Sequence, residues 1–158
     1  MFLWTYSPGC SAIFSFVLSE GWAAVTSGQT FGGTAVFRYD PWRQEAAVPL
    51  LPGGGVHLEI PYQVGNNLTL GIALANPSAT RTAHITEVIR DQNGSQLSSR
   101  TFTLAALNHT AFIPTYSTGT TGGGVAEYDS DISIFGLGIR SAPEGTGLTF
   151  TSVPAVYR

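Results

Sequence analysis

Residues 84–104 read HITEVIRDQNGSQLSSRTFTL and carry the strongest structural signal of the chain. Two runs rich in Thr, Val, Ile, Leu and Phe flank the segment Asp91-Gln92-Asn93-Gly94. β-Branched and aromatic residues favour strands, and an Asn-Gly pair accepts the positive φ angles of a tight turn. The segment therefore predicts a β-hairpin with strands over residues 82–90 and 96–104.

Runs of the same kind recur along the chain, with turn residues between them. They cover residues 12–18, 22–26, 33–38, 56–62, 68–75, 82–90, 96–104, 110–114, 124–128, 132–139 and 148–153, and GTTGGG at 119–124 predicts a flexible hairpin loop. Short strands separated by Gly- and Pro-rich turns are typical of a β-sandwich, and no long amphipathic helix interrupts them. The predicted fold is all-β, an antiparallel immunoglobulin-like β-sandwich with additional N-terminal strands. Because 158 residues without a linker or repeat fit one domain, we expect residues 1–158 to form a single domain.

The composition excludes two classes of partner. The chain has no lysine, seven arginines and ten acidic residues, and its net charge is -3. Nucleic acids and anionic membranes need a basic surface, so we expect neither as a partner. Cys10 is the single cysteine, so the fold depends on packing and not on an internal disulfide.

The first twenty residues, MFLWTYSPGCSAIFSFVLSE, are unusually apolar. They lack the basic start and the small-x-small cleavage site of a convincing signal peptide, and the apolar run is too short to span a bilayer. We interpret them as a packed strand or as a contact with a neighbouring copy. The chain is therefore expected to form a homo-oligomer.

Six sequence segments carry a family resemblance: GTAVFR, EAAVPL, GIALANPS, RDQNGSQLSSRTFTLAALNHTAFIP, GLGIR and FTSVPA. From about Gly21 onward the chain resembles an uncharacterised family of secreted bacterial β-sandwich modules with an immunoglobulin-like arrangement. The resemblance implies the sandwich fold and a secreted protein, although the first twenty residues depart from the family's cleavable signal. No activity is known in that family, so the resemblance implies no site residues.

The three histidines of the chain have a common position in the predicted topology. Short antiparallel connections make consecutive strands alternate in direction, so His57, His84 and His109 all fall at the same end of the fold. Three imidazoles from three strands are the minimal ligand set of an open zinc site, in which water keeps the fourth position. The sequence predicts these three residues as ligands of Zn²⁺ or another divalent transition metal.

Carboxylates accompany these histidines. Glu127, Asp129 and Asp131 alternate along the segment EYDSDIS, so we expect them on one face of a strand. An immunoglobulin-like layout makes that strand the neighbour of the strand that carries His84. The predicted general base is Glu87 or Asp129.

The resulting functional prediction is a metal-dependent hydrolase. Metal-bound water becomes hydroxide near neutral pH, and the metal polarises a carbonyl or phosphoryl oxygen. An open site on a shallow rim predicts small activated esters or phosphoesters as substrates. Solvated rim histidines, and an acidic face that is solvated or binds calcium weakly, are the alternatives at this point.

The rival prediction is a non-catalytic secreted adhesion or carbohydrate-binding module. Tyr39, Trp42 and Tyr116 fall in predicted loops, where an exposed ring can stack on a sugar or a partner. The aromatic residues inside the alternating runs are instead predicted to fill the core, and they are Trp22, Phe37, Phe102, Phe112, Phe135 and Phe150. Cys10 is read as a packing residue.

Overall fold

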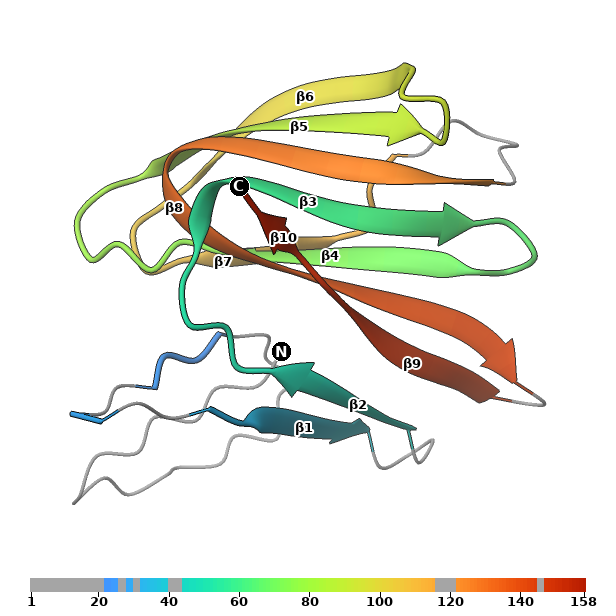
Figure 1. The fold of residues 1–158 in the computed structure, drawn as a ribbon, viewed down its shortest axis with the longest axis horizontal. Coiled ribbons are helices and arrows are strands. Elements are labelled where there is room, and N and C mark those ends of the chain that lie inside the picture. The colour runs from blue at the N-terminus through green and yellow to red at the C-terminus, as the bar shows by residue number, and fades with distance from the viewer. Residues whose placement is uncertain (1–21, 26–27, 30–31, 40–43, 116–121, 145–146) are drawn as a thin grey trace.

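A computed structural model describes residues 22–25, 28–29, 32–39, 44–115, 122–144 and 147–158 (Figure 1). The described residues form strands joined by turns, and they contain no helix that could cross a membrane. The strands are β1 (Thr34–Tyr39), β2 (Gln44–Pro49), β3 (Gly55–Val64), β4 (Thr69–Ala75), β5 (Ala83–Asp91), β6 (Gln96–Leu104), β7 (His109–Phe112), β8 (Gly122–Glu144), β9 (Gly147–Pro154) and β10 (Val156–Tyr157). The all-β antiparallel prediction is confirmed.

The long strand β8 belongs to both layers of the sandwich. Its first half lies between β3 and β5, and its second half lies between β4 and β9. Figure 1 shows β8 turning back on itself where it passes from one layer to the other. The first layer has the order β10-β3-β8-β5-β6 and the second has β7-β4-β8-β9, with every pairing antiparallel. Strands β1 and β2 form a separate antiparallel pair.

Side chains alternate between the two faces of each strand, as an extended backbone requires. In β3, for example, Leu58, Ile60 and Tyr62 are buried, whereas His57 and Glu59 are only half-buried on the opposite face. The buried side chains of both layers form one core: Leu58, Ile60, Tyr62, Leu70, Ile72, Leu74, Ala83, Ile85, Ile89, Leu104, Ala126, Tyr128, Ile132, Ile134 and Ala155. We call the side of the first layer that faces away from this core the outer face.

The hairpin of residues 84–104 forms as predicted, with β5 and β6 as its strands. Asp91 Oδ1 accepts hydrogen bonds from the backbone N–H of Asn93 (2.8 Å) and Ser95 (2.9 Å), and Gly94 takes a φ of 81°. The positive φ at Gly94 explains why glycine suits this turn.

Several strand boundaries differ from the sequence-based expectations. Residues 124–128 and 132–139 belong to one continuous strand, and Gly122 to Gly124 begin that strand instead of closing a loop. A Cβ atom on Gly124 would overlap the Arg90 carbonyl oxygen of β5, so glycine here permits close strand approach. Residues 22–25 lie in no strand, and β2 and β10 were not predicted.

Candidate functional site

The three histidines occupy the beginnings of three strands, but these strands belong to two different layers. His57 and His84 lie on β3 and β5 of the first layer, whereas His109 begins β7 and lies opposite Ala75 of β4 in the second. The described part of the chain contains no group of three or more His, Cys, Asp or Glu side chains that could hold a metal ion. The structure therefore does not assemble the predicted ligand set of His57, His84 and His109. Alternating strand direction places residues at one end of a sandwich, but it does not place them in one layer.

His57 instead lies between two carboxylates on the outer face. It is directly opposite Asp129 of β8, and its Nδ1 is 2.6 Å from Asp129 Oδ1. Its Nε2 is 3.4 Å from Oε1 of Glu59, two residues further along β3. Both ring nitrogens can donate at once only in the imidazolium form. The hydrogen bond with Asp129 raises the pKa of His57 above 6.5, and partial burial opposes this shift.

Two arginines complete this group of charges. Glu59 lies directly opposite Glu127 of β8, and such like charges repel unless cations accompany them. Arg158 Nη2 lies 3.1 Å from Glu59 Oε2, and Arg90 Nε donates to both Glu127 oxygens at 2.8 and 3.0 Å. We call this set the outer-face charge network; its members are His57, Glu59, Arg90, Glu127, Asp129 and Arg158. The network explains why this polar sheet face is stable, because each carboxylate has a cationic partner.

The predicted placement of the acidic residues on β8 is partly confirmed. Glu127 and Asp129 share the outer face, and β8 is the neighbour of the strand that carries His84. Asp131 accepts a 2.8 Å hydrogen bond from the backbone N–H of His84 and lies 3.8 Å from Arg81 Nη2. The N–H of His84 is the main reason that the pKa of Asp131 lies below its ordinary value.

Glu87, one of the two predicted bases, points into the core and not to the rim. Its side chain is 3% exposed, and Arg100 of β6 binds it through Nε (2.6 Å) and Nη2 (3.1 Å). The Arg100 guanidinium also lies 4.2 Å from the ring centre of Phe112 and 5.0 Å from that of Phe102. Since His84 and Glu87 are an odd number of residues apart on one strand, they must face opposite sides of the sheet. The prediction that Glu87 serves as a rim base is therefore wrong.

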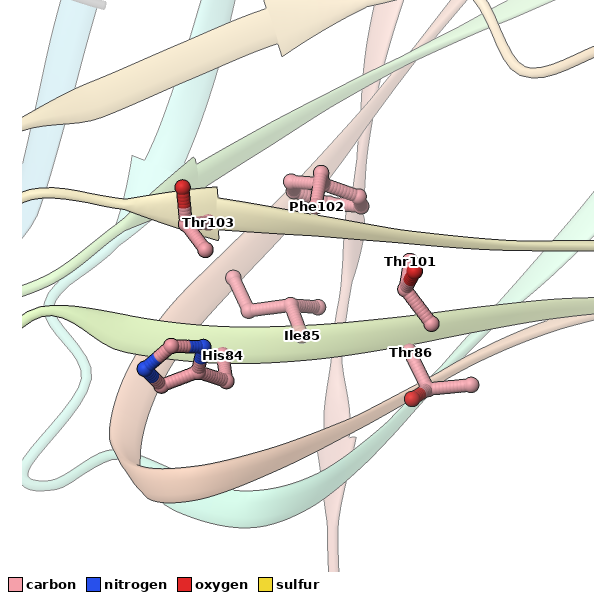
Figure 2. A pocket seen from close by; sticks show the side chains of 6 residues that line it. All are labelled: His84, Ile85, Thr86, Thr101, Phe102 and Thr103. Carbon is pink, nitrogen blue, oxygen red and sulfur yellow. The ribbon is translucent and has the colours of Figure 1, made fainter.

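A shallow hollow of about 330 Å³ lies over β5 and β6. Residues of both strands line it, namely His84, Ile85, Thr86, Thr101, Phe102 and Thr103 (Figure 2). His84 lies opposite Thr103 and Thr86 opposite Thr101, so these four side chains share the outer face. Sequence reasoning missed this hollow, although the polar residues spaced by two in HIT (His84, Thr86) and TFT (Thr101, Thr103) were the available signal.

Several predicted features lie outside the described residues: the segment 1–20 with Cys10, the side chain of Tyr39 and of Phe37, Trp42, and Tyr116. Trp22 lies in a non-strand segment, and its Nε1–H donates to the Leu107 carbonyl oxygen at 3.2 Å. Phe102 and Phe112 pack against the core in edge-to-face contact, with ring centres 5.9 Å apart, as predicted for core aromatics.

Comparisons with known proteins inform the fold and not the activity. No protein-family model matches the chain, and the search of curated proteins finds no match. A solved structure titled "Crystal Structure of Thermotoga maritima 1070" is similar, with a TM-score of 0.57 and 8% sequence identity. The alignment covers 66% of this chain and 96% of that one. At this level of identity the likeness shows a shared β fold alone, and the resemblance to secreted bacterial immunoglobulin-like modules stays a prediction.

Proposed function

We propose that this chain is a non-catalytic binding module that recognises a neutral, hydroxyl-rich ligand such as a carbohydrate. The hollow over β5 and β6 carries this proposal. Its six lining residues include no Asp, Glu, Lys or Arg, while three of them are threonines and one is a histidine. An uncharged surface of hydrogen-bonding groups suits a neutral polyol better than it suits a charged ligand.

The chemistry of the lining groups supports this choice of ligand. Each threonine hydroxyl both donates and accepts hydrogen bonds, as sugar hydroxyls do, and the His84 ring adds nitrogen atoms that can hydrogen-bond to a ligand. The threonine methyl groups can contact the C–H faces of a sugar ring. Because the hollow is open and lies on the surface of a sheet, we expect weak binding and a preference for extended oligosaccharides over single sugars.

The predicted zinc hydrolase has less support. A histidine binds a metal through the lone pair of a neutral ring, and the two carboxylates beside His57 favour the protonated ring instead. Arg158 on Glu59 and Arg90 on Glu127 add positive charge where a metal ion would have to approach. The hydrolase, its Zn²⁺ cofactor and its ester or phosphoester substrates therefore stay predictions.

The proposed module is tested by titrating purified protein with neutral oligosaccharides of several linkages in a calorimeter or on a glycan array. We expect binding by the wild type and at least a tenfold weaker Kd, about 1.4 kcal/mol, for the double variant Thr86→Ala/Thr103→Ala. Thr151→Ala is the matched control, because Thr151 is an exposed strand threonine of the other layer. Equal losses in both variants, or no glycan binding by the wild type, contradict the proposal.

A separate measurement decides between the module and the hydrolase. Protein purified without a histidine tag is assayed for bound metal and for esterase and phosphoesterase activity, before and after chelation. If the wild type holds about one zinc ion, chelation abolishes an esterase activity, and His57→Ala, His84→Ala and His109→Ala each lose the metal, the hydrolase is correct. We expect instead that none of these three substitutions changes the metal content.

A further inference from the structure

The edges of the first layer differ in how well they are protected against pairing with another strand. At one edge, β10 covers part of β3, and Pro61 lies on the remaining part of β3, where it offers no N–H. At the other edge, β6 pairs with β5 and with no other strand of the described chain. The nine residues of β6 include no proline, and the charged side chain among them, Arg100, is held by Glu87 on the core side. The register irregularity of β6 lies at Leu97, and the charge of Arg100 is neutralised by Glu87, so residues 99–104 carry no proline, no bulge and no unpaired charge.

Two backbone hydrogen bonds fix the direction of the amide groups along this edge. The N–H of His84 donates to Asp131 of β8, so the even-numbered residues of β5 direct their N–H groups toward β8. The N–H of Arg158 donates to the His57 carbonyl, so the backbone N–H and C=O of His57 point away from β8. The backbone groups of Asp129, the residue opposite His57, therefore point toward β5. Both observations indicate that the backbone N–H and C=O of Thr86 point toward β8. Thr101, the residue opposite Thr86, therefore directs its own N–H and C=O away from β5.

The same alternation extends along β6. Ser99, Thr101 and Thr103 all direct their backbone groups to the free edge, while Arg100 and Phe102 bond to β5. Before this stretch, the Ser98 side chain, on the core side opposite Ile89, donates through Oγ to the Thr115 carbonyl at 3.3 Å, so the chain after β7 contacts β6 at Ser98. Residues 99–104 are consequently the part of β6 with an edge open to a partner, as far as the described residues extend.

We infer that this edge is the interface of a two-fold symmetric homodimer, in which β6 pairs antiparallel with β6 of a second copy. A two-fold axis at Thr101 places Thr101 opposite the partner's Thr101 and Ser99 opposite the partner's Thr103. All these residues direct their backbone groups outward, so the ladder of hydrogen bonds closes in both directions. The two first layers then form one continuous sheet across the interface.

The single charged side chain of β6, Arg100, favours this register over the register with an axis at Arg100. An axis at Thr101 sets Arg100 opposite the partner's Phe102, a cation beside an aromatic ring. An axis at Arg100 would instead place two guanidinium groups directly opposite each other, which is unfavourable. An axis at Phe102 pairs only Thr101 and Thr103 through outward backbone groups, whereas the axis at Thr101 also pairs Ser99. The strand is therefore self-complementary in one register, which is why we choose a second copy as the occupant.

Disulfide trapping tests the interface and its register together. In a Cys10→Ser background, Thr101→Cys should form a disulfide-linked dimer under mild oxidation, because residues paired across this axis have Cα atoms about 5.5 Å apart. Thr86→Cys is the matched control: it lies on the same face opposite Thr101 but on an internal strand. Efficient trapping of Thr101→Cys alone supports the dimer. Trapping of neither variant, or of both to the same extent, overturns it.

Solution mass gives the second measurement. Sedimentation equilibrium of the wild type between about 1 µM and 1 mM should show a monomer–dimer equilibrium. Thr101→Pro removes an outward N–H and leaves the bonds to β5 in place, so it should weaken the dimer at least about tenfold, whereas Thr101→Ser should not. A wild type that stays monomeric over the whole range overturns the inference. The mass readout is independent of glycan binding, so failure of the dimer and failure of the proposed ligand are distinguishable.

Discussion

The core side and the outer face of the first layer each carry a charged pair, and the two pairs are built differently. On the core side, Glu87 is 3% exposed and is bound through two nitrogens by Arg100, which stacks on Phe112. On the outer face, Asp129 is 59% exposed and meets one nitrogen of His57. Water can replace the partner of an exposed carboxylate but not that of a buried one. A carboxylate paired with a cationic side chain therefore contributes mainly to stability on the core side and mainly to pH sensitivity on the outer face.

The largest expected effect comes from breaking the core-side pair at its cation. Arg100→Ala leaves the Glu87 carboxyl group buried without its partner and removes the guanidinium from Phe112. We expect the free energy of unfolding to fall by about 3 kcal/mol, measured by urea denaturation. Arg90→Ala on the outer face is the matched control, because Glu127 remains partly hydrated, and it should cost less than about 1 kcal/mol.

A double replacement sharpens this prediction. Glu87→Leu with Arg100→Met removes both charges and fills the site with apolar groups of similar size. Its unfolding free energy should lie within about 1 kcal/mol of the wild type, because no buried charge is left alone. If the double variant is as unstable as Arg100→Ala, the packing of Arg100 on Phe112, and not the ion pair, holds β6 against β7.

The pair of His57 and Asp129 on the outer face should make the free energy of unfolding depend on pH. The pKa of His57 in the folded protein lies above its unfolded value of about 6.5, mainly because of Asp129. Protonation of His57 therefore stabilises the fold fully below about pH 6.5, and this contribution is lost as the pH rises through the folded pKa. The loss should be less than about 1 kcal/mol, measured by denaturation at several pH values.

Two variants separate this effect from other titrations. His57→Gln should abolish the loss of stability in that pH window, and His84→Gln serves as control because its ring makes no ion pair in the described structure. If His57→Gln keeps the full pH dependence, another group is responsible, and the outer-face charge network does not sense pH through His57.

The comparison of the two faces also explains what the sequence could predict. The hairpin of residues 84–104 was predictable because its turn chemistry and its alternation are local. The continuity of β8 was not, since its turn from one layer to the other depends on strands that pair with each half. That turn decides which layer each histidine joins. It places His109 in the second layer, whereas His57 and His84 lie in the first, so the predicted three-histidine site does not form.

The inward position of Glu87 was readable in principle. Ile85, Glu87 and Ile89 are spaced by two residues and therefore share one face of the strand. An isoleucine on each side of the glutamate indicates a buried carboxylate that needs a cation. The cation itself, Arg100, is found only from the register across the hairpin. The position of the strand was thus predictable from the sequence. The side of the sheet on which a polar side chain lies had to be inferred from its spacing to the neighbouring apolar residues.

The smallest expected effect comes from removing the exposed acid of the outer-face pair. Asp129→Asn keeps the shape of the side chain but removes the charge that holds the His57 proton, so the pKa of His57 should move down toward its ordinary value. Titration of the imidazole resonances by NMR measures this shift, while the unfolding free energy at pH 8 should change by less than about 0.5 kcal/mol. Because Glu59 still lies 3.4 Å from the other ring nitrogen, part of the shift should persist, and Glu59→Gln in the same background should remove the remainder. An unchanged His57 pKa in Asp129→Asn would mean that the 2.6 Å contact does not exist in solution, and the contrast between the two faces would then rest on Glu87 and Arg100 alone.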